Sequence, residues 1–221
     1  MKDGELKNLG MELSRFVVGT EGNISKRTTD GFRIKASGVS LKYMDEDSCV
    51  ACTLDGDPME GEVNRPSMEW SFHSWIFKNS TYQIIAHTHP TNTLKILCTD
   101  NLIQEFATKR LFPDQVVFNG EEACVVPYAT PGLELTQEIQ DAVGEYMILR
   151  GEFPKLLLLK NHGIICCANT AKEAIIMTEV CEKAAEIFIG SKSLHSVDFL
   201  TDSEVKSILD HEDEKYRREL V

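Results

Sequence analysis

The sequence predicts an α/β fold in which helices cover a β-sheet. Helical and strand-like patterns alternate along the 221 residues, and no internal repeat or flexible linker separates them. Interleaved strands and helices bury their apolar faces by packing the helices onto a sheet. We therefore expect one domain over residues 1–221, of which residues 202–221 form a charged helical tail.

The first part of the chain alternates between helix and strand patterns. Leucines at steps of three and four predict a helix over residues 4–18, followed by a glycine-rich turn. Alternating apolar and basic residues predict a strand over 32–36, and a second strand is expected over 48–54. Ser67 is placed to cap a helix that ends near Asn79. An apolar run then leads to His87.

The second part of the chain continues the alternation. The expected elements are, in order, short helices around 91–98 and 102–108, apolar runs at 116–118 and 123–126, a helix over 134–150, strands over 155–160 and 164–168, and a long helix that begins with a capping box at Thr170 and runs to Gly190.

Composition narrows the classes of function. The formal net charge of -12 argues against nucleic acid and anionic membranes as partners, since both require a basic face. A membrane helix needs about 18 or more consecutive apolar residues, and no run in this chain approaches that length. The charged start lacks the apolar core of a signal peptide. The seven cysteines lie mostly in apolar stretches, as free thiols do, and the C-x-x-C at Cys49 has no second pair. We expect a cytoplasmic protein that acts on small molecules.

Three histidines are candidates for a metal site. His87 and His89 are one residue apart at the end of an apolar run, so their side chains leave the same face of an extended segment. His162 follows another apolar run and lies in a turn-forming Asn-His-Gly. Six histidines in this chain could produce such a pair by chance, but Glu69 upstream adds a fourth donor. Three imidazoles with an open position are typical of catalytic zinc.

Six motifs together resemble the class II aldolase/adducin family, most closely its fuculose-1-phosphate aldolase branch. The likeness spans most of the chain and depends on the order and spacing of the motifs. They are GTEGNIS at 19–25, ASG at 36–38, RPSMEWSFH at 65–73, HTH at 87–89, PYATPG at 127–132 and NHG at 161–163.

The resemblance implies a three-layer α/β/α sandwich with a mixed, mostly antiparallel central sheet, assembled as a homotetramer. It also implies a metal, most often Zn²⁺, on His87, His89, His162 and, at rest, Glu69. Mn²⁺, Fe²⁺ and Co²⁺ are alternatives, because such ligands accept each of them. Glu69 would also move protons during catalysis. Without the histidines, a glutamate in a first helical turn would be read as stabilising the helix dipole.

A substrate phosphate could lie in a nest of backbone and hydroxyl donors. The expected donors are Gly22, Asn23, Ser37, Gly38 and Ser67. At two positions the chain departs from the family: Glu21 replaces a small residue, and Met68 replaces a second serine. An acidic side chain beside a phosphate would be repulsive, so the sequence leaves open whether the substrate is phosphorylated.

Two further residues match the family pattern. Tyr216 falls where the family places a C-terminal tyrosine that helps to protonate the intermediate, although a tyrosine in a terminal segment is more often only packed. His73, one helical turn after Glu69, is interpreted as packing or supporting the site rather than as catalytic.

The function that these residues favour is a metal-dependent lyase. Breaking a carbon–carbon bond beside a carbonyl leaves an enediolate, whose developing negative charge a divalent cation stabilises. The expected substrate is a short ketose or ketose 1-phosphate, cleaved by a retro-aldol reaction. A sugar-phosphate 4-epimerase, a decarboxylase or a dehydratase is the alternative, since each uses a related step. A non-catalytic, adducin-like protein is disfavoured because all three histidines are present.

Overall fold

The computed structural model describes residues 4–45 and 47–220, so residues 1–3, 46 and 221 of the expected domain lie outside the described part. Within it, seven strands form one sheet in the order β3-β2-β1-β4-β7-β6-β5, in which β5 and β6 are parallel and the other neighbours antiparallel. The strands are β1 (Asn23–Arg27), β2 (Gly31–Lys35), β3 (Cys49–Thr53), β4 (Ile84–Thr88), β5 (Cys124–Val126), β6 (Leu156–Leu159) and β7 (Gly163–Ala168).

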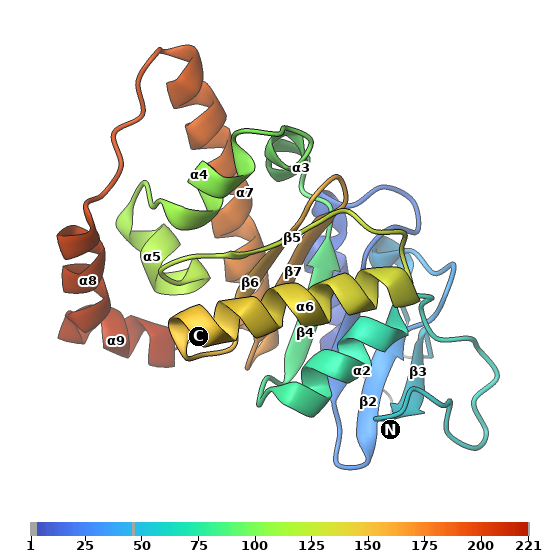
Figure 1. The fold of residues 1–221 in the computed structure, drawn as a ribbon. Coiled ribbons are helices and arrows are strands. Elements are labelled where there is room, and N and C mark those ends of the chain that lie inside the picture. Colours follow the sequence, from blue (N-terminus) through green and yellow to red (C-terminus); the bar gives the residue numbers. More distant parts are fainter. Residues whose placement is uncertain (1–3, 46, 221) are drawn as a thin grey trace.

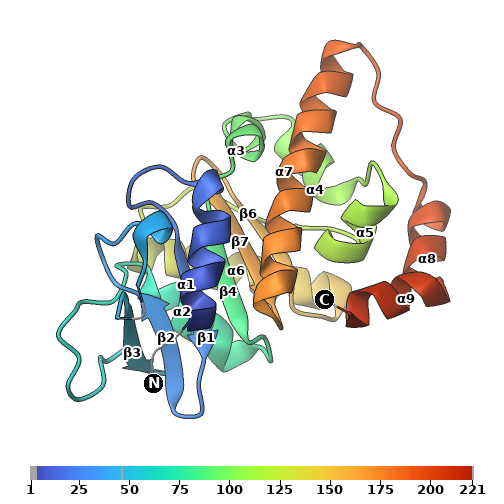
Figure 2. The ribbon, with the colours of Figure 1, turned by 180° about the vertical axis from the view of Figure 1, so that it is seen from behind.

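Helices cover both faces of this sheet, which gives the three layers (Figures 1 and 2). One face carries α2 (Trp70–Asn79) and α6 (Leu133–Arg150). The other carries α1 (Gly4–Leu13), α3 (Thr91–Leu97), α4 (Ile103–Thr108), α5 (Pro113–Asn119) and α7 (Ala171–Ser193). Two 3-10 turns, η1 (Ser14–Phe16) and η2 (Leu41–Tyr43), flank the first strands, and α8 (Asp202–Asp210) and α9 (Glu212–Glu219) end the chain. The predicted α/β fold is confirmed.

The central strand β4 shows how the two cores position the site. Ile84 and Ala86 point into the core beneath α1 and α7, and Ile85 points into the core beneath α2 and α6. By the two-residue period of a strand, His87 shares the face of Ile85. The ring of Phe72 on α2 lies edge-on to the His87 ring, with centroids 5.7 Å apart. The first histidine of the pair is therefore fully buried between the sheet and α2.

The strand β1 was not predicted. Its sequence, Asn-Ile-Ser-Lys-Arg, has only one apolar residue. It follows a glycine-rich segment that was expected to be a turn. It forms nevertheless between β2 and β4, because Asn23 and Ser25 are buried with hydrogen-bond partners on α2. A strand of buried polar residues leaves no alternation of apolar side chains for pattern analysis to detect.

The prediction that Ser67 caps a helix was wrong. Helix α2 begins at Trp70, and Glu69 occupies the N-cap position. The chain before it stays extended because the Ser67 N–H donates to the Lys35 carbonyl at 3.0 Å and Pro66 forms a bridge with Ala36. The Ser67 hydroxyl instead accepts the Glu69 N–H at 3.4 Å. Because the segment before it is anchored against β2, the helix begins only at Trp70 and Glu69 lies at its N-cap.

Three smaller differences concern helices. The first helix ends at Leu13 and continues as a 3-10 turn instead of reaching residue 18. The apolar run at 116–118 belongs to α5, which begins with a proline at its N-terminal turn. The predicted start of α7 is confirmed, since the Thr170 side chain accepts the Glu173 N–H at 3.0 Å. None of the described helices combines the length and apolarity that a membrane span requires.

Candidate metal centre

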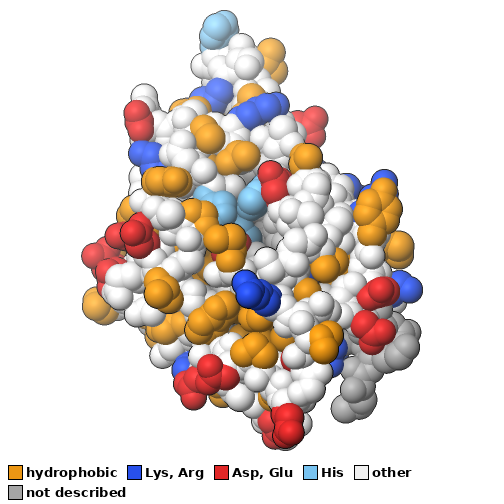
Figure 3. Space-filling model, turned by 90° about the vertical axis from the view of Figure 1, so that its right-hand side faces the viewer, with side chains coloured by type: hydrophobic (Ala, Val, Ile, Leu, Met, Phe, Trp, Pro, Cys, Tyr) orange, Lys and Arg blue, Asp and Glu red, His pale blue; other side chains and the backbone are white. Residues whose placement is uncertain are grey.

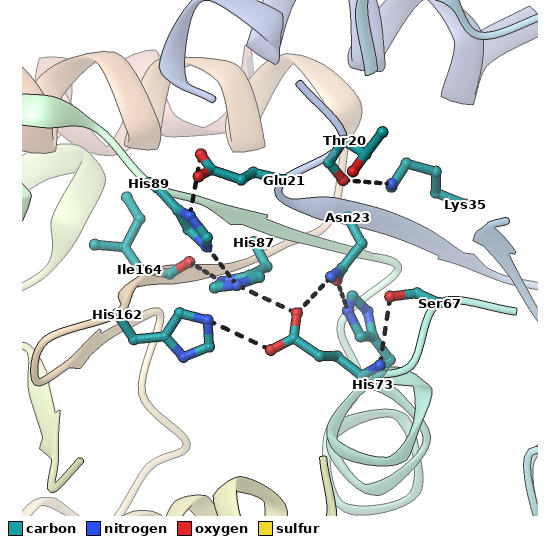
Figure 4. A network of polar contacts seen from close by, with 11 residues as sticks. Thr20, Glu21, Asn23, Lys35, Ser67, His73, His87, His89, His162 and Ile164 are labelled. Carbon is teal, nitrogen blue, oxygen red and sulfur yellow. Dashed lines mark hydrogen bonds and ion pairs between the residues drawn. The ribbon is translucent and has the colours of Figure 1, made fainter. Parts of the chain in front are cut away.

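The three predicted histidines converge at one end of the central strands. His87 is in β4, His89 follows that strand, and His162 lies in the turn between β6 and β7. Because β4 and β7 are antiparallel neighbours, paired at Thr88 and Ile164, the end of one meets the start of the other. A ligand nitrogen from each histidine lies within 4.8 Å of the others (Figure 4). That spacing allows a single cation to contact all three.

The two histidines of the pair turn the same nitrogen inward. The His87 Nδ1–H donates to the Ile164 carbonyl at 2.9 Å, which leaves the Nε2 lone pair available. The Nε2 atoms of His87 and His89 are 3.0 Å apart. Two neutral nitrogen lone pairs at this distance repel each other unless a proton or a cation lies between them.

Burial keeps these imidazoles neutral. Loss of solvent, with the neighbouring histidines adding to it, lowers the pKa of His87 to about 3 and that of His89 to about 4. Burial also lowers the pKa of His162. A lowered pKa means that each ring is uncharged at neutral pH, and the uncharged ring is the form that binds a metal.

Glu69 completes the donor set. Its Oε2 lies 3.4 Å from the His87 Nε2, and its Oε1 lies 3.5 Å from the His162 Nε2. The residue is 7% exposed, and Oε1 has no hydrogen-bond partner among the described residues. A buried, unpartnered carboxylate oxygen is costly unless a ligand satisfies it. Three neutral imidazoles and this carboxylate fit a divalent cation such as Zn²⁺ in ligand type and number.

A chain of hydrogen bonds holds Glu69 in place. The Ser25 hydroxyl donates to the His73 Nδ1 at 2.6 Å, and the His73 Nε2–H donates to the Asn23 side-chain oxygen. Asn23 in turn donates its amide N–H to Glu69 Oε2 at 2.7 Å. Burial lowers the pKa of His73 well below its usual range, which keeps the neutral form that this relay requires. His73 therefore supports the site, as predicted, and Asn23 contacts Glu69 through its side chain.

Gly163 is required by the close approach of the histidine pair. A Cβ at this position would lie 2.5 Å from the Thr88 carbonyl oxygen and 2.6 Å from the His89 ring carbon Cδ2. Both distances are below van der Waals contact, so a side chain could fit only if the strand end or the ring moved. The glycine in the Asn-His-Gly turn thus serves the metal site as well as the turn.

We expect Gly163→Ala to lower stability by about 1–3 kcal/mol, the range for overpacking a dense interior, and to weaken metal binding. Chemical denaturation and metal titration would measure both effects. Gly144→Ala is the matched control: in helix α6 an added Cβ meets nothing within 4 Å, so its stability should be unchanged or higher. A Gly163→Ala protein that behaves like the control would contradict the steric argument.

A pocket of about 240 Å³ opens beside these residues. All five residues expected to bind a phosphate contribute to its wall: Gly22, Asn23, Ser37, Gly38 and Ser67. Met68 and Glu21, the two departures from the family pattern, line it as well. Figure 3 shows histidine side chains at the bottom of a hollow on this face, with hydrophobic side chains around it. The expected binding residues are therefore neighbours, and their role in binding a phosphate stays a prediction.

Tyr216 lies elsewhere in the protomer. It is 61% exposed on α9, next to Arg217, which pairs with Asp114 on α5 at 2.9 Å. It is not among the residues that line the pocket. The structure thus does not bring Tyr216 to the histidines of its own chain, and its catalytic role stays a prediction.

Lys35 lines the pocket but was not predicted as a site residue. It is 2% exposed, and its Nζ donates to the carbonyls of Val39 at 2.6 Å and Thr20 at 3.1 Å. Burial lowers its pKa, while the charge of Glu69 opposes that shift. Strand alternation indicated a solvent-facing lysine. Its position near the end of β2 lets the long side chain reach the loop around Thr20 instead.

Comparison with known proteins identifies the family. The model of the "Class II Aldolase and Adducin N-terminal domain" matches residues 8–189, so the chain belongs to the class II aldolase and adducin family. It is 29% identical over 175 residues to the L-fuculose phosphate aldolase of Methanococcus maripaludis, covering 78% of this chain and 87% of that protein. It is 31% identical over 193 residues to the 5-deoxy-D-ribulose 1-phosphate aldolase of Bacillus thuringiensis, covering 86% and 84%.

A solved structure of an L-fuculose 1-phosphate aldolase matches with a TM-score of 0.79 at 25% identity, covering 96% of this chain and 94% of that one. The three-layer sandwich is therefore shared. The chain is homologous to class II sugar-phosphate aldolases, which are metal-dependent lyases.

Proposed function

We propose that this protein is a divalent-metal-dependent aldolase that cleaves a short ketose 1-phosphate, or the corresponding ketose, by a retro-aldol reaction. The observation that carries the proposal is the convergence of His87, His89, His162 and the carboxylate of Glu69 beside one pocket. One oxygen of that carboxylate has no hydrogen-bond partner among the described residues. The names of the two enzyme relatives support a sugar phosphate as the substrate, and one of them names a 1-phosphate.

The reaction requires charge stabilisation and proton movement. When the bond between C3 and C4 of a 2-ketose breaks, the C4 hydroxyl loses a proton and becomes an aldehyde. The bonding electrons remain on C3 and spread to the C2 oxygen. A divalent cation bound to the histidines would supply positive charge to stabilise this oxygen, with Zn²⁺ the first candidate and Mn²⁺, Fe²⁺ or Co²⁺ the alternatives. The three neutral histidines would hold the cation without reducing its charge.

Glu69 is the residue that we assign to proton transfer. Its carboxylate is buried and close to the histidine nitrogens, yet one oxygen has no partner among the described residues. If a substrate binds near the histidines, the Glu69 carboxylate would lie within reach of its reacting carbons. The Asn23 amide then orients the other oxygen. Glu69 can thus accept the proton that the C4 hydroxyl loses and deliver it to C3 after the bond has broken.

The pocket wall supports an anionic end group on the substrate. Lys35 contributes a positive charge, and the Ser67 hydroxyl contributes a hydrogen-bond donor. The negative charge of Glu21 and the absence of a second serine hydroxyl at Met68 weaken the attraction for an anion. Exposed apolar side chains occur close to the pocket. Met68 lines it, and Leu133 lies two residues after Pro131, which also lines it. We propose that further copies of the chain cover these side chains in a homotetramer.

Incubating the purified protein with a panel of ketoses and ketose 1-phosphates, with and without a chelator, tests the proposal. We expect release of an aldehyde and a three-carbon ketone, lost on chelation and restored by a divalent metal. Formation of a new sugar without cleavage would indicate an epimerase instead, and loss of carbon dioxide from an acidic substrate a decarboxylase. Turnover that chelation leaves unchanged would contradict the metal-dependent mechanism.

Ser67→Ala is expected to raise KM for phosphorylated substrates about tenfold, because a hydrogen bond to a charged group contributes about 1.5–3 kcal/mol. The unphosphorylated sugar is the internal control, since it has no phosphate for Ser67 to contact. Steady-state kinetics on both substrates would measure the difference. An equal loss on the two sugars would remove the phosphate role from Ser67.

A further inference from the structure

Glu21 lies beside one of the histidines. Its Oε2 is 3.4 Å from the His89 Nδ1, the ring nitrogen opposite to the Nε2 that faces His87 (Figure 4). The carboxylate thus approaches the outer side of the imidazole, away from the nitrogen that would hold a metal. Its side chain is 48% exposed.

The turn before β1 fixes the position of this carboxylate. The Glu21 N–H donates to the Val18 carbonyl at 3.2 Å, and the Val18 N–H donates back to Glu21 Oε2 at 3.0 Å. The same segment is tied to His89 through the backbone, because the His89 N–H donates to the Phe16 carbonyl at 3.1 Å. Gly22 has a positive φ of 67°, and a Cβ there would lie 2.8 Å from the His87 carbonyl oxygen. The loop is therefore packed directly against the segment that carries the pair.

The outer nitrogens of the three histidines have different partners. That of His87 donates to a neutral backbone carbonyl. That of His162 is buried and has no hydrogen-bond partner among the residues that the structure describes. Within the described part of the chain, only His89 has a carboxylate beside its outer nitrogen. A carboxylate behind a ligating imidazole fixes the Nδ1–H tautomer, orients the ring and makes Nε2 a stronger donor.

We infer that Glu21 is a positioning residue that orients His89 and raises the affinity of the site for its divalent metal. The inference rests on the proposed function, because it assumes that His89 is a ligand. This role also explains why an acidic side chain lies at the edge of a pocket proposed to bind an anion. The Glu21 carboxylate interacts with His89 and need not contact the substrate. Removal of such a carboxylate typically costs 10- to 100-fold in metal affinity.

Zinc dissociation constants of the unmodified protein and of Glu21→Ala, Glu21→Gln and His89→Ala, measured by competition with a chelating dye, test the inference. We expect Glu21→Ala to weaken binding about tenfold, at the low end of that range because the carboxylate is half exposed. Glu21→Gln keeps an oxygen acceptor without charge, so it should lose less. Glu186→Gln, which removes an exposed carboxylate from α7, is the charge-matched control and should bind as the unmodified protein does.

A second measurement separates positioning from a merely structural role of the turn. In the zinc-loaded protein, the His89 Nδ1–H should give a slowly exchanging imidazole NMR signal, which Glu21→Ala should shift and broaden by faster exchange with water. Equal affinities and an unchanged signal in Glu21→Ala would overturn the inference. So would a loss in Glu21→Ala as complete as that in His89→Ala, since Glu21 would then itself be a ligand. If the unmodified protein and His89→Ala bind zinc equally, the proposed metal centre fails, and this result is distinguishable from both.

Discussion

His89→Ala should release the metal and abolish activity together. Three imidazoles hold the cation, and the loss of one leaves His87, His162 and the carboxylate of Glu69, with the space of a ring open to water. A cation at a developing negative charge contributes several kcal/mol of transition-state stabilisation, which corresponds to about a thousandfold or more in rate. Elemental analysis of the dialysed protein and the aldehyde-release assay would show both losses.

His211→Ala is the matched control for this variant. His211 is an exposed histidine between α8 and α9, and its removal should leave metal content and turnover unchanged. Circular dichroism would establish that both variants keep the fold. A His89→Ala protein that retains stoichiometric metal would show that the three histidines do not form the site, and a metal-free protein with full turnover would separate the metal from the reaction.

Glu69→Gln should keep the metal but lose turnover by about 10²- to 10⁴-fold, the usual contribution of a general acid or base. Glutamine has the same shape and retains an oxygen near the histidines, so metal binding should persist on the three imidazoles. It cannot take or give a proton at neutral pH. Because Glu69 is assigned to proton transfer and not to phosphate binding, KM should change far less than kcat.

Two measurements decide this prediction. Metal content should stay near that of the unmodified protein, and kcat should fall for phosphorylated and unphosphorylated sugars alike. Glu60→Gln, which changes an exposed carboxylate, should leave both quantities unaltered. Unchanged turnover in Glu69→Gln would remove this residue from proton transfer, and complete loss of metal would make it mainly a ligand.

Most of the fold could be predicted because apolar residues with a regular period mark the elements that pack against the sheet. The runs that became β2, β3, β4, β6 and β7 were all recognised, as were α2, α6 and α7. β1 could not be found in this way, since its buried side chains Asn23 and Ser25 are polar and are satisfied by residues about 50 positions away. A strand stabilised by long-range hydrogen bonds carries no local signal.

In the site too, the features with a local sequence pattern were predicted and those that depend on distant contacts were not. The histidine triad was predictable because strand periodicity fixes His87 and His89 on one face and the turn fixes His162. Lys35 was missed because alternation indicates the face from which a side chain starts and not how far it reaches. The contact of Glu21 with His89 depends on a turn of irregular backbone, whose geometry the sequence did not reveal.

The bare position at Gly163 also has an evolutionary consequence. A side chain at this position and the histidine pair would compete for the same space, because a Cβ would clash with both the end of the strand and a histidine ring. In descendants of this chain that retain the pair, selection should hold the glycine fixed. Lineages that discard the histidines gain room for alanine or serine there, so the two sites should covary and reveal which homologues have abandoned catalysis.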